Sequence, residues 1–297
     1  MRPTALVPAL LCAASLVLTF LCLFAGHKRD FMENFHLVTL NTSRIGQNLL
    51  NSSTAGNSDN PFSVLLHNIT NAINGEIDDI AGDLAKQLGV EDFYSAHILD
   101  YCYGSYVPGP LANATVSKKQ IHKNVTKCLN TTAGYEFDPT AALEKSLADN
   151  GVNITLKELD WPDDIQKGIK TVHVLQKIVF GFYCAGIALT FVALLGALAA
   201  IFASGRLMAL INILVSALAW IVLAIASAIV TVVIDKSSSV VNKYGKPIGV
   251  EAHRGAKFLI ITWVATALVI LASIAWCFEC VIGSRKRRQS AYVGKQG

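Results

Sequence analysis

Four long apolar runs constrain this chain more than any other feature of its sequence. They cover residues 4–25, 178–203, 207–234 and 258–283, and each is long enough to provide the roughly 20 residues that cross the hydrocarbon core of a bilayer. The first three runs contain no Asp, Glu, Lys or Arg, and the fourth contains only Glu279, near its end, where a carboxylate can reach water. The sequence therefore predicts a membrane protein of the all-α class with four transmembrane helices.

The first run has an alternative reading as a secretory signal peptide, because Arg2 precedes an apolar stretch that ends in "CLFAG". The apolar core of a cleaved signal is usually about 7–15 residues long, and this run is longer. We expect it to be retained as a span, while cleavage stays open.

The spans divide the chain into nine parts. We expect a cytoplasmic N-terminus (1–3), TM1 (4–25), extracellular loop 1 (26–174), TM2 (175–203), a cytoplasmic turn (204–206), TM3 (207–234), extracellular loop 2 (235–257), TM4 (258–283) and a basic cytoplasmic tail (284–297).

Charge supports this orientation. Residues 27–174 carry 18 acidic and 12 basic residues, whereas the tail "SRKRRQSAYVGKQG" has five Lys and Arg and no acid. The positive-inside rule places that tail in the cytoplasm, together with the N-terminus. Loop 235–257 disagrees with the rule, because it has five basic against two acidic residues and is expected outside.

Seven N-x-Ser/Thr sequons decide between these signals, because all of them lie in the first loop and glycosylation takes place on the lumenal side. We expect glycans on at least some of Asn41, Asn51, Asn68, Asn113, Asn124, Asn130 and Asn153. The alternative is a polar loop that happens to be rich in Asn and Thr.

Two of the seven cysteines, Cys102 and Cys128, lie in this loop. Thiols in an oxidising compartment usually pair, so we expect a disulfide that closes a loop of about 27 residues and contributes about 3 kcal/mol on the chain-entropy estimate. His97, Asp100 and Cys102 also contain the parts of a thiol nucleophile. No oxyanion or nucleophile-elbow context accompanies them, so we expect His97 to pack or bond locally and Asp100 to lie on a solvated face.

The first loop shows local order. Three- and four-residue apolar steps over 61–88 predict a helix, as do caps and stops at 138–151, and a third helix begins at "DWPDDIQKG" and runs into TM2. Segments 36–43 and 98–106 have strand-like composition and predict a small β-sheet.

Small residues line TM2 and TM3, and such residues let helices approach closely in lipid. They predict a tight bundle or a homo-oligomer through these faces; alternatively, a generic bundle explains most of them, because alanine is common in spans. The residues are Gly181, Ala185, Ala188, Ala193, Gly196, Ala197 and Ala200 in TM2, and Ser216, Ala219, Ala224, Ser227 and Ala228 in TM3. The spans contain no buried charge or broken-helix pair, which disfavours transport.

The order of parts disfavours tetraspanins, whose large loop lies between the last two spans, and matches claudin-like proteins. Within that class the chain resembles the fungal cortical-patch SUR family, grouped with PalI-type pH-response regulators. The resemblance rests on "DFYSAHILDYCYG" (92–104), on Cys128 and on the four-span layout. Tyr101 stands where animal claudins have a tryptophan motif, and the two loop cysteines lie further apart, so a paracellular pore is not carried over.

The resemblance implies a non-enzymatic organiser of plasma-membrane domains of the eisosome type, linked to endocytosis and cell-wall integrity. The alternative is an accessory role in PalI-type ambient-pH signalling, although the tail of about 14 residues is short for docking. A membrane enzyme is disfavoured, and no catalytic, cofactor or metal site and no nucleic-acid partner are expected. Expected partners are membrane lipids and other membrane-domain proteins.

The end of TM4 carries the last candidate sites. Cys277 and Cys280 lie beside a basic cluster, which favours S-palmitoylation. A C-x-x-C pair can also bind zinc, but no further ligands lie nearby. The basic cluster is expected to attract anionic inner-leaflet lipid or to act only as a topology signal; it consists of Arg285, Lys286, Arg287 and Arg288.

Overall fold

Each of the four apolar runs forms a helix. The helices are α1 (Leu6–Phe24), α6 (Asp163–Phe202), α7 (Arg206–Gly245) and α8 (Ala256–Val293), with a short 3-10 helix at Pro3–Ala5 before α1. Each contains a stretch long and apolar enough to cross a membrane. The predicted fold class, a mostly helical four-span protein with a small sheet, is confirmed.

The computed structural model describes residues 3–44, 90–107, 122–129, 163–202, 206–246 and 250–293, with single positions at 141, 144, 145 and 148. The chain divides into two units. The helical unit consists of residues 1–24, 178–231 and 257–297, and the sheet unit consists of residues 25–177 and 232–256.

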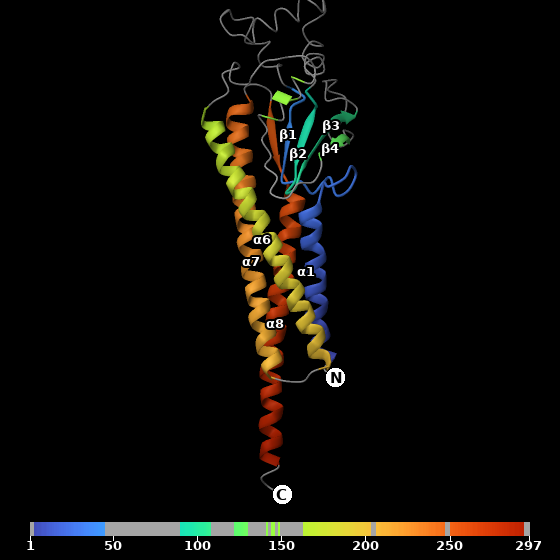
Figure 1. Ribbon diagram of the computed structural model, residues 1–297, viewed down its shortest axis with the longest axis vertical. Coiled ribbons are helices and arrows are strands. Elements are labelled where there is room, and N and C mark those ends of the chain that lie inside the picture. The colour runs from blue at the N-terminus through green and yellow to red at the C-terminus, as the bar shows by residue number, and fades with distance from the viewer. Residues whose placement is uncertain are drawn as a thin grey trace, which may run out of the picture. The chain divides into compact units, whose positions relative to one another are not determined.

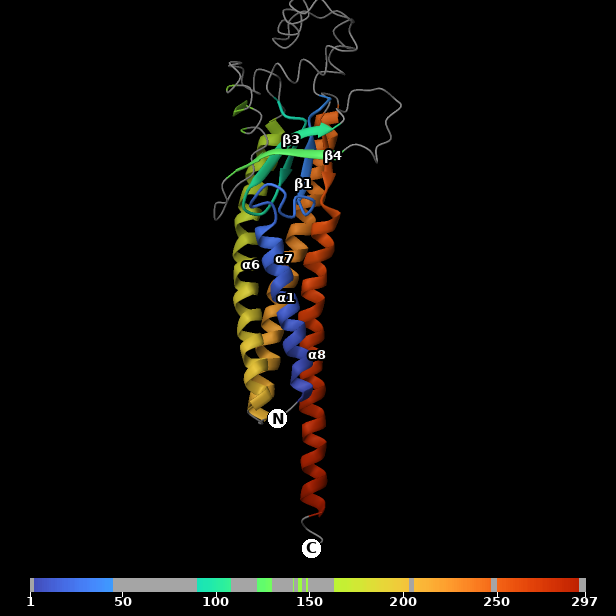
Figure 2. The same ribbon diagram turned by 90° about the vertical axis from the view of Figure 1, so that its right-hand side faces the viewer.

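In the helical unit the four helices run side by side, and α8 continues past the end of the others (Figures 1 and 2). At 1.5 Å per residue, the 38 residues of α8 extend about 57 Å, whereas a hydrocarbon core is about 30 Å thick. The helix therefore includes much of the basic segment that sequence analysis assigns to a tail.

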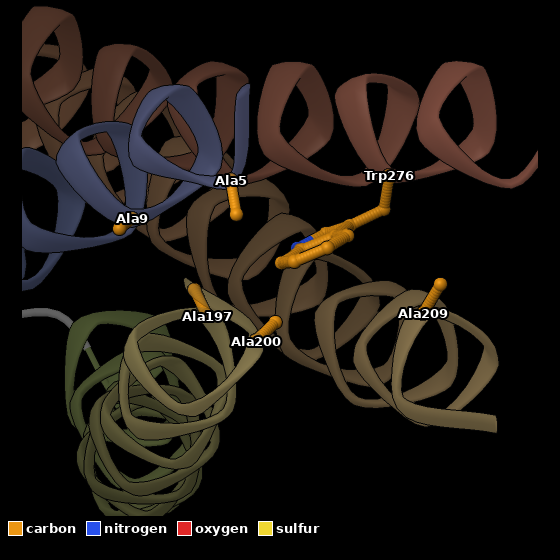
Figure 3. Packing of buried hydrophobic residues seen from close by; sticks show 6 residues of the cluster. All are labelled: Ala5, Ala9, Ala197, Ala200, Ala209 and Trp276. Carbon is orange, nitrogen blue, oxygen red and sulfur yellow. The ribbon is translucent and has the colours of Figure 1, made fainter. Parts of the chain in front are cut away.

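Small side chains set the packing at one end of the bundle. The indole of Trp276 lies among five alanines from three other helical segments (Figure 3). Only 2% of Trp276 is exposed. The members are Ala5 and Ala9 near the N-terminus, Ala197 and Ala200 of α6, and Ala209 of α7. Alanines leave the space that one large ring fills, which accounts for part of the small-residue content of TM2.

Hydroxyl groups hold the middle of the bundle together. The Ser227 hydroxyl lies 2.8 Å from that of Thr262, which also bonds the hydroxyl of Tyr183, so that α6, α7 and α8 meet in one network. Ser15 of α1 donates to the carbonyl of Ala265 at 2.8 Å. Interhelical bonds of this kind contribute about 0.6 kcal/mol each on average.

The sheet unit contains five antiparallel strands (Figure 1). They are β1 (Val38–Asn41), β2 (Phe93–Ala96), β3 (Tyr101–Val107), β4 (His122–Cys128) and β5 (Glu251–Arg254), in the order β4-β3-β2-β1-β5. The register pairs Thr39 with Ser95 and with His253. The expected small sheet therefore exists and recruits a strand from the loop between α7 and α8.

The strand predictions were partly wrong. β1 lies inside the predicted 36–43, but residues 98–100 of the predicted 98–106 form a turn, in which the His97 amide donates to the Asp100 carbonyl at 2.9 Å. Strands β2, β4 and β5 were not predicted. Polar four- and seven-residue strands such as "EAHR" lack the β-branched or aromatic alternation that marks a strand, and they form because a neighbouring edge is available.

The structure describes only some of the segments that were predicted to be helical in the first loop. The third predicted helix begins at Asp163 and continues through the second span as one element. The predicted helix over 61–88 lies outside the described residues. Of 138–151, only positions 141, 144, 145 and 148 are described, and these are helical.

Candidate functional site in the sheet unit

The two loop cysteines form a disulfide, Cys102–Cys128, across the β3–β4 pair. Cys102 is completely buried and packs in one cluster with Phe93 and Val125. A bonded sulfur cannot attack a substrate, so the thiol-nucleophile interpretation finds no support in this arrangement. The disulfide instead ties the edge strand β4 to the rest of the sheet.

His97 lies in the turn between β2 and β3 and is 1% exposed. Neither ring nitrogen makes a hydrogen bond within the described residues, although the Phe35 backbone is close enough to favour the charged ring. Loss of hydration outweighs this effect and, with the nearby charges of His36 and Lys123, lowers the pKa of His97 to about 3. The imidazole is therefore neutral at physiological pH.

Asp100 ends the same turn and is also fully buried. The expectation of a solvated carboxylate was wrong, because the turn that joins β2 to β3 places this residue inside the unit, with its backbone carbonyl accepting the His97 amide. His97 is packed, as expected.

Glu33 joins this cluster from the segment that follows α1. Two residues just before it, Asp30 (φ 67°) and Met32 (φ 51°), adopt the left-handed conformation, which is uncommon for side-chain-bearing residues. Both carboxylate oxygens of Glu33 are buried and make no hydrogen bond that meets normal geometry. Burial raises the pKa of Glu33, and the positive charge of Lys123 and the hydroxyl of Ser95 oppose that rise.

Lys123 reaches into the unit from the edge strand β4. Its ammonium donates to the hydroxyls of Thr39 (2.9 Å) and Ser95 (3.3 Å), and it lies 5.0 Å from the centre of the Phe93 ring. Burial lowers the pKa of Lys123 to about 8, and the charge of Glu33 opposes this shift. The sheet must curl for a β4 side chain to reach β1, and the polar groups collect on its inner face.

Three donor atoms of this cluster converge. A carboxylate oxygen of Glu33, a ring nitrogen of His97 and Sγ of Cys102 all lie within 4.8 Å of one another. Sequence reasoning identified His97 and Cys102 but missed Glu33 and Lys123. Glu33 lies 64 residues before His97, Lys123 lies 21 residues after Cys102, and neither belongs to a local motif.

Two of the seven sequons fall on described residues. Asn124 is exposed on β4. Asn41 is half-buried in β1, and its side-chain oxygen accepts bonds from the Ser43 amide (3.1 Å) and hydroxyl (2.7 Å). The other five, Asn51, Asn68, Asn113, Asn130 and Asn153, lie outside the described residues.

The acylation candidates lie on α8, where Cys277 is exposed and Cys280 is half-buried, both as free thiols. The helix continues through positions 285–288. The side chains of those four basic residues lie outside the description.

Gly26 supports the cluster directly, and a side chain there should disrupt it. Gly26 has φ 80°, and a Cβ would lie 2.4 Å from Cδ2 of His97. We expect Gly26→Ala to lower the free energy of unfolding by about 2 kcal/mol or more, from the strained backbone and the clash. Thermal unfolding in detergent measures this.

Gly181→Ala is the matched control, because a Cβ at Gly181 meets nothing within 4 Å and alanine favours a helix. Adding His97→Ala should recover part of the loss in Gly26→Ala. Purely additive effects of the two substitutions would show that the ring contact is not the cause.

Exposure predicts which described sequon is used. In a eukaryotic host, Asn124→Gln should remove one glycosidase-sensitive step of gel mobility, because its amide is accessible. Asn41→Gln should remove none, since Asn41 is engaged with Ser43. Loss of a step at Asn41 alone would contradict the described arrangement.

Comparison with known proteins shows which family this chain resembles. A family model described as "SUR7/PalI family" matches residues 4–275. The "SUR7 family protein pun1" of Schizosaccharomyces pombe is 24% identical over 199 residues, which cover 61% of this chain and 65% of that protein. The match thus spans just under two thirds of that relative, and no solved structure matches the chain. Because the family model covers most of the sequence, including the first three apolar runs and residues 258–275 of the fourth, this chain belongs to the SUR7/PalI family.

Proposed function

We propose that this multi-pass membrane protein is a non-enzymatic organiser of plasma-membrane domains, of the cortical-patch type that serves endocytosis and cell-wall integrity. Family membership carries this proposal. Its partners are membrane lipids and other proteins of the same membrane domain.

The interior of the helical unit supports a structural role over transport. The buried polar side chains of its spans are hydroxyls and one amide, among them Ser15, Thr190, Asn212 and Ser227, and no charged residue is buried in the described part of this unit. Transport pathways usually require charged or strongly polar groups at mid-membrane. Here some of the polar groups bond between helices, as Ser15 does to the Ala265 carbonyl and Ser227 to the Thr262 hydroxyl, and these bonds join the helices.

The proposed orientation has the sheet unit outside the cell and both termini in the cytoplasm. The sequons, the negative charge of residues 27–174 and the disulfide all favour an exterior, oxidising location for the sheet unit. The basic end of α8 then faces the anionic inner leaflet, and Cys277 and Cys280 lie where acyltransferases act on juxtamembrane thiols.

Part of the small-residue surface is free for lateral association. Gly181, Ala185 and Ala188 recur at helical spacing on α6 and are exposed, whereas Ala193, Ala197 and Ala200 are buried within the bundle. The exposed set supports close approach of a second helix, from another copy or from another membrane-domain protein.

Live imaging tests the organiser role. In a yeast strain whose own copy of this protein has been deleted, the tagged full-length protein should form immobile cortical patches with slow fluorescence recovery. Replacing both Cys102 and Cys128 by Ser should disperse the patches, because the edge strand β4 loses its covalent tie. Cys184→Ser, at an exposed free thiol, should leave them intact.

The alternative, ambient-pH signalling, predicts a different phenotype. A diffuse membrane signal, combined with failure of the deletion strain to grow at alkaline pH, would overturn the organiser proposal and favour an accessory of a pH receptor.

Acyl exchange tests the membrane-facing thiols. The wild type should carry a thioester-linked acyl group that is lost in the Cys277→Ser, Cys280→Ser double variant and kept in Cys184→Ser. An unchanged signal in the double variant would place acylation elsewhere. Neutralising residues 285–288 should weaken patch retention; intact patches and unchanged topology would refute the lipid-attraction role.

A further inference from the structure

The donor atoms of Glu33, His97 and Cys102 lie close together, and neither the disulfide nor the proposed function accounts for this arrangement. A carboxylate, an imidazole and a thiolate are the ligands that divalent cations of the zinc class take from proteins. Their donor atoms lie within 4.8 Å of one another, while two ligands of one tetrahedral ion stand about 3.5 Å apart at ordinary zinc bond lengths. A small inward movement therefore brings all three onto one ion.

His97 is the strongest indication of a ligand. Its two ring nitrogens are buried, and neither is hydrogen-bonded within the described part of the chain. An unsatisfied buried polar atom is destabilising, so a pair of this kind calls for an explanation. A cation bound at one nitrogen would satisfy it, and the neighbouring Phe35 backbone could orient the ring through the other, as is usual for ligating imidazoles.

Glu33 supplies the second indication independently, from a different segment. Its two carboxylate oxygens are buried without a hydrogen bond of normal geometry. The Lys123 ammonium is held by Thr39 and Ser95, and the described ion pairs do not include Lys123 with Glu33. The carboxylate is thus left available to a second cation.

We propose that, while Cys102 is a free thiol, Glu33, His97 and Cys102 bind one divalent cation of the zinc class, and that closure of the Cys102–Cys128 disulfide releases it. The carboxylate and the thiolate together balance the two positive charges. In the disulfide form only Glu33 and His97 remain as strong donors, so affinity falls. The proposal departs from the expectation, based on the sequence, that the chain has no metal site.

The closure step balances with a disulfide oxidant, small or protein-borne. The bound Cys102 thiolate and the Cys128 thiol give up two electrons and form the S–S bond. The oxidant takes those electrons and the Cys128 proton and leaves as one thiolate and one thiol. The cation, having lost its sulfur ligand, dissociates as a divalent ion.

Two matched variants separate the site from mere loss of the disulfide. Cys128→Ser and Cys102→Ser both remove the bond, but only the first leaves a sulfur beside His97. Both are made in full-length protein with Cys277→Ser and Cys280→Ser, so that the C-x-x-C pair on α8 does not bind metal. The probes are Co²⁺, whose thiolate charge-transfer band reports sulfur ligation, and Zn²⁺, counted by elemental analysis.

We expect one zinc per chain and a charge-transfer band in Cys128→Ser. In Cys102→Ser we expect binding to be weaker by more than about 100-fold, beyond the roughly 10- to 100-fold that outer-shell losses cause. Disulfide-intact protein should show no charge-transfer band. When protein that retains both Cys102 and Cys128 is reduced, loaded with zinc and then oxidised, it should release one equivalent of zinc. Equal binding by the two serine variants, or no band in Cys128→Ser, overturns the proposal.

The other two ligands are tested in the Cys128→Ser background. Glu33→Gln and His97→Gln should each weaken zinc binding, whereas His253→Gln, at an exposed histidine of β5, should not. Zinc should also raise the thermal midpoint of Cys128→Ser and not of its Glu33→Gln derivative. Unchanged affinity in both glutamine variants refutes the assigned ligands. Patch formation is a separate readout, so its loss or persistence bears on the proposed function alone.

Discussion

Hydrocarbon offers no partner to a peptide N–H or C=O, and this constraint determines most of the molecule. A chain that crosses lipid must satisfy every backbone group internally, so the four apolar runs become helices whatever their detailed sequence. The same constraint acts on side chains. Ser15, Thr262 and Asn212 each bond to a carbonyl or hydroxyl of another segment, and these bonds join helices for which the hydrophobic effect supplies no mutual attraction.

The sheet unit differs from the helical unit, because ionisable side chains are buried in its interior. Thr39, Ser95 and Lys123 satisfy one another, while His97 and Glu33 remain without bonds of normal geometry. A polar interior of this kind is more costly than an apolar one. The left-handed residues before Glu33 and the bare backbone at Gly26 add further cost at the same place. Local cost concentrated around one cluster is typical of a site retained for its chemistry.

The sequence predicted the helices well because hydrophobic length is a local property that can be read from any one run. It predicted the sheet poorly, because β5 is four residues whose strand state depends on pairing with β1, more than 200 residues earlier. The site divided in the same way. His97 and Cys102 lie in one short stretch of sequence, so both could be recognised as candidate site residues. Glu33 and Lys123 join them only through the turn after α1 and the curl of the sheet, and no spacing in the sequence records either.

Asn242 has a consequence for how such molecules can crowd together. Its side-chain amide bonds both the N–H and the C=O of Ala252 (2.8 and 2.9 Å), so a single residue of α7 imitates a neighbouring strand on the outer side of β5. The opposite margin of the sheet, β4, carries the exposed Lys127 and the accessible Asn124. An exposed edge strand can pair with a strand of another chain and so polymerise, and proteins prevent this by placing charges on the edge or by covering it. With one margin covered and the other charged, many copies can be concentrated in a small area of membrane without their sheets fusing into fibres.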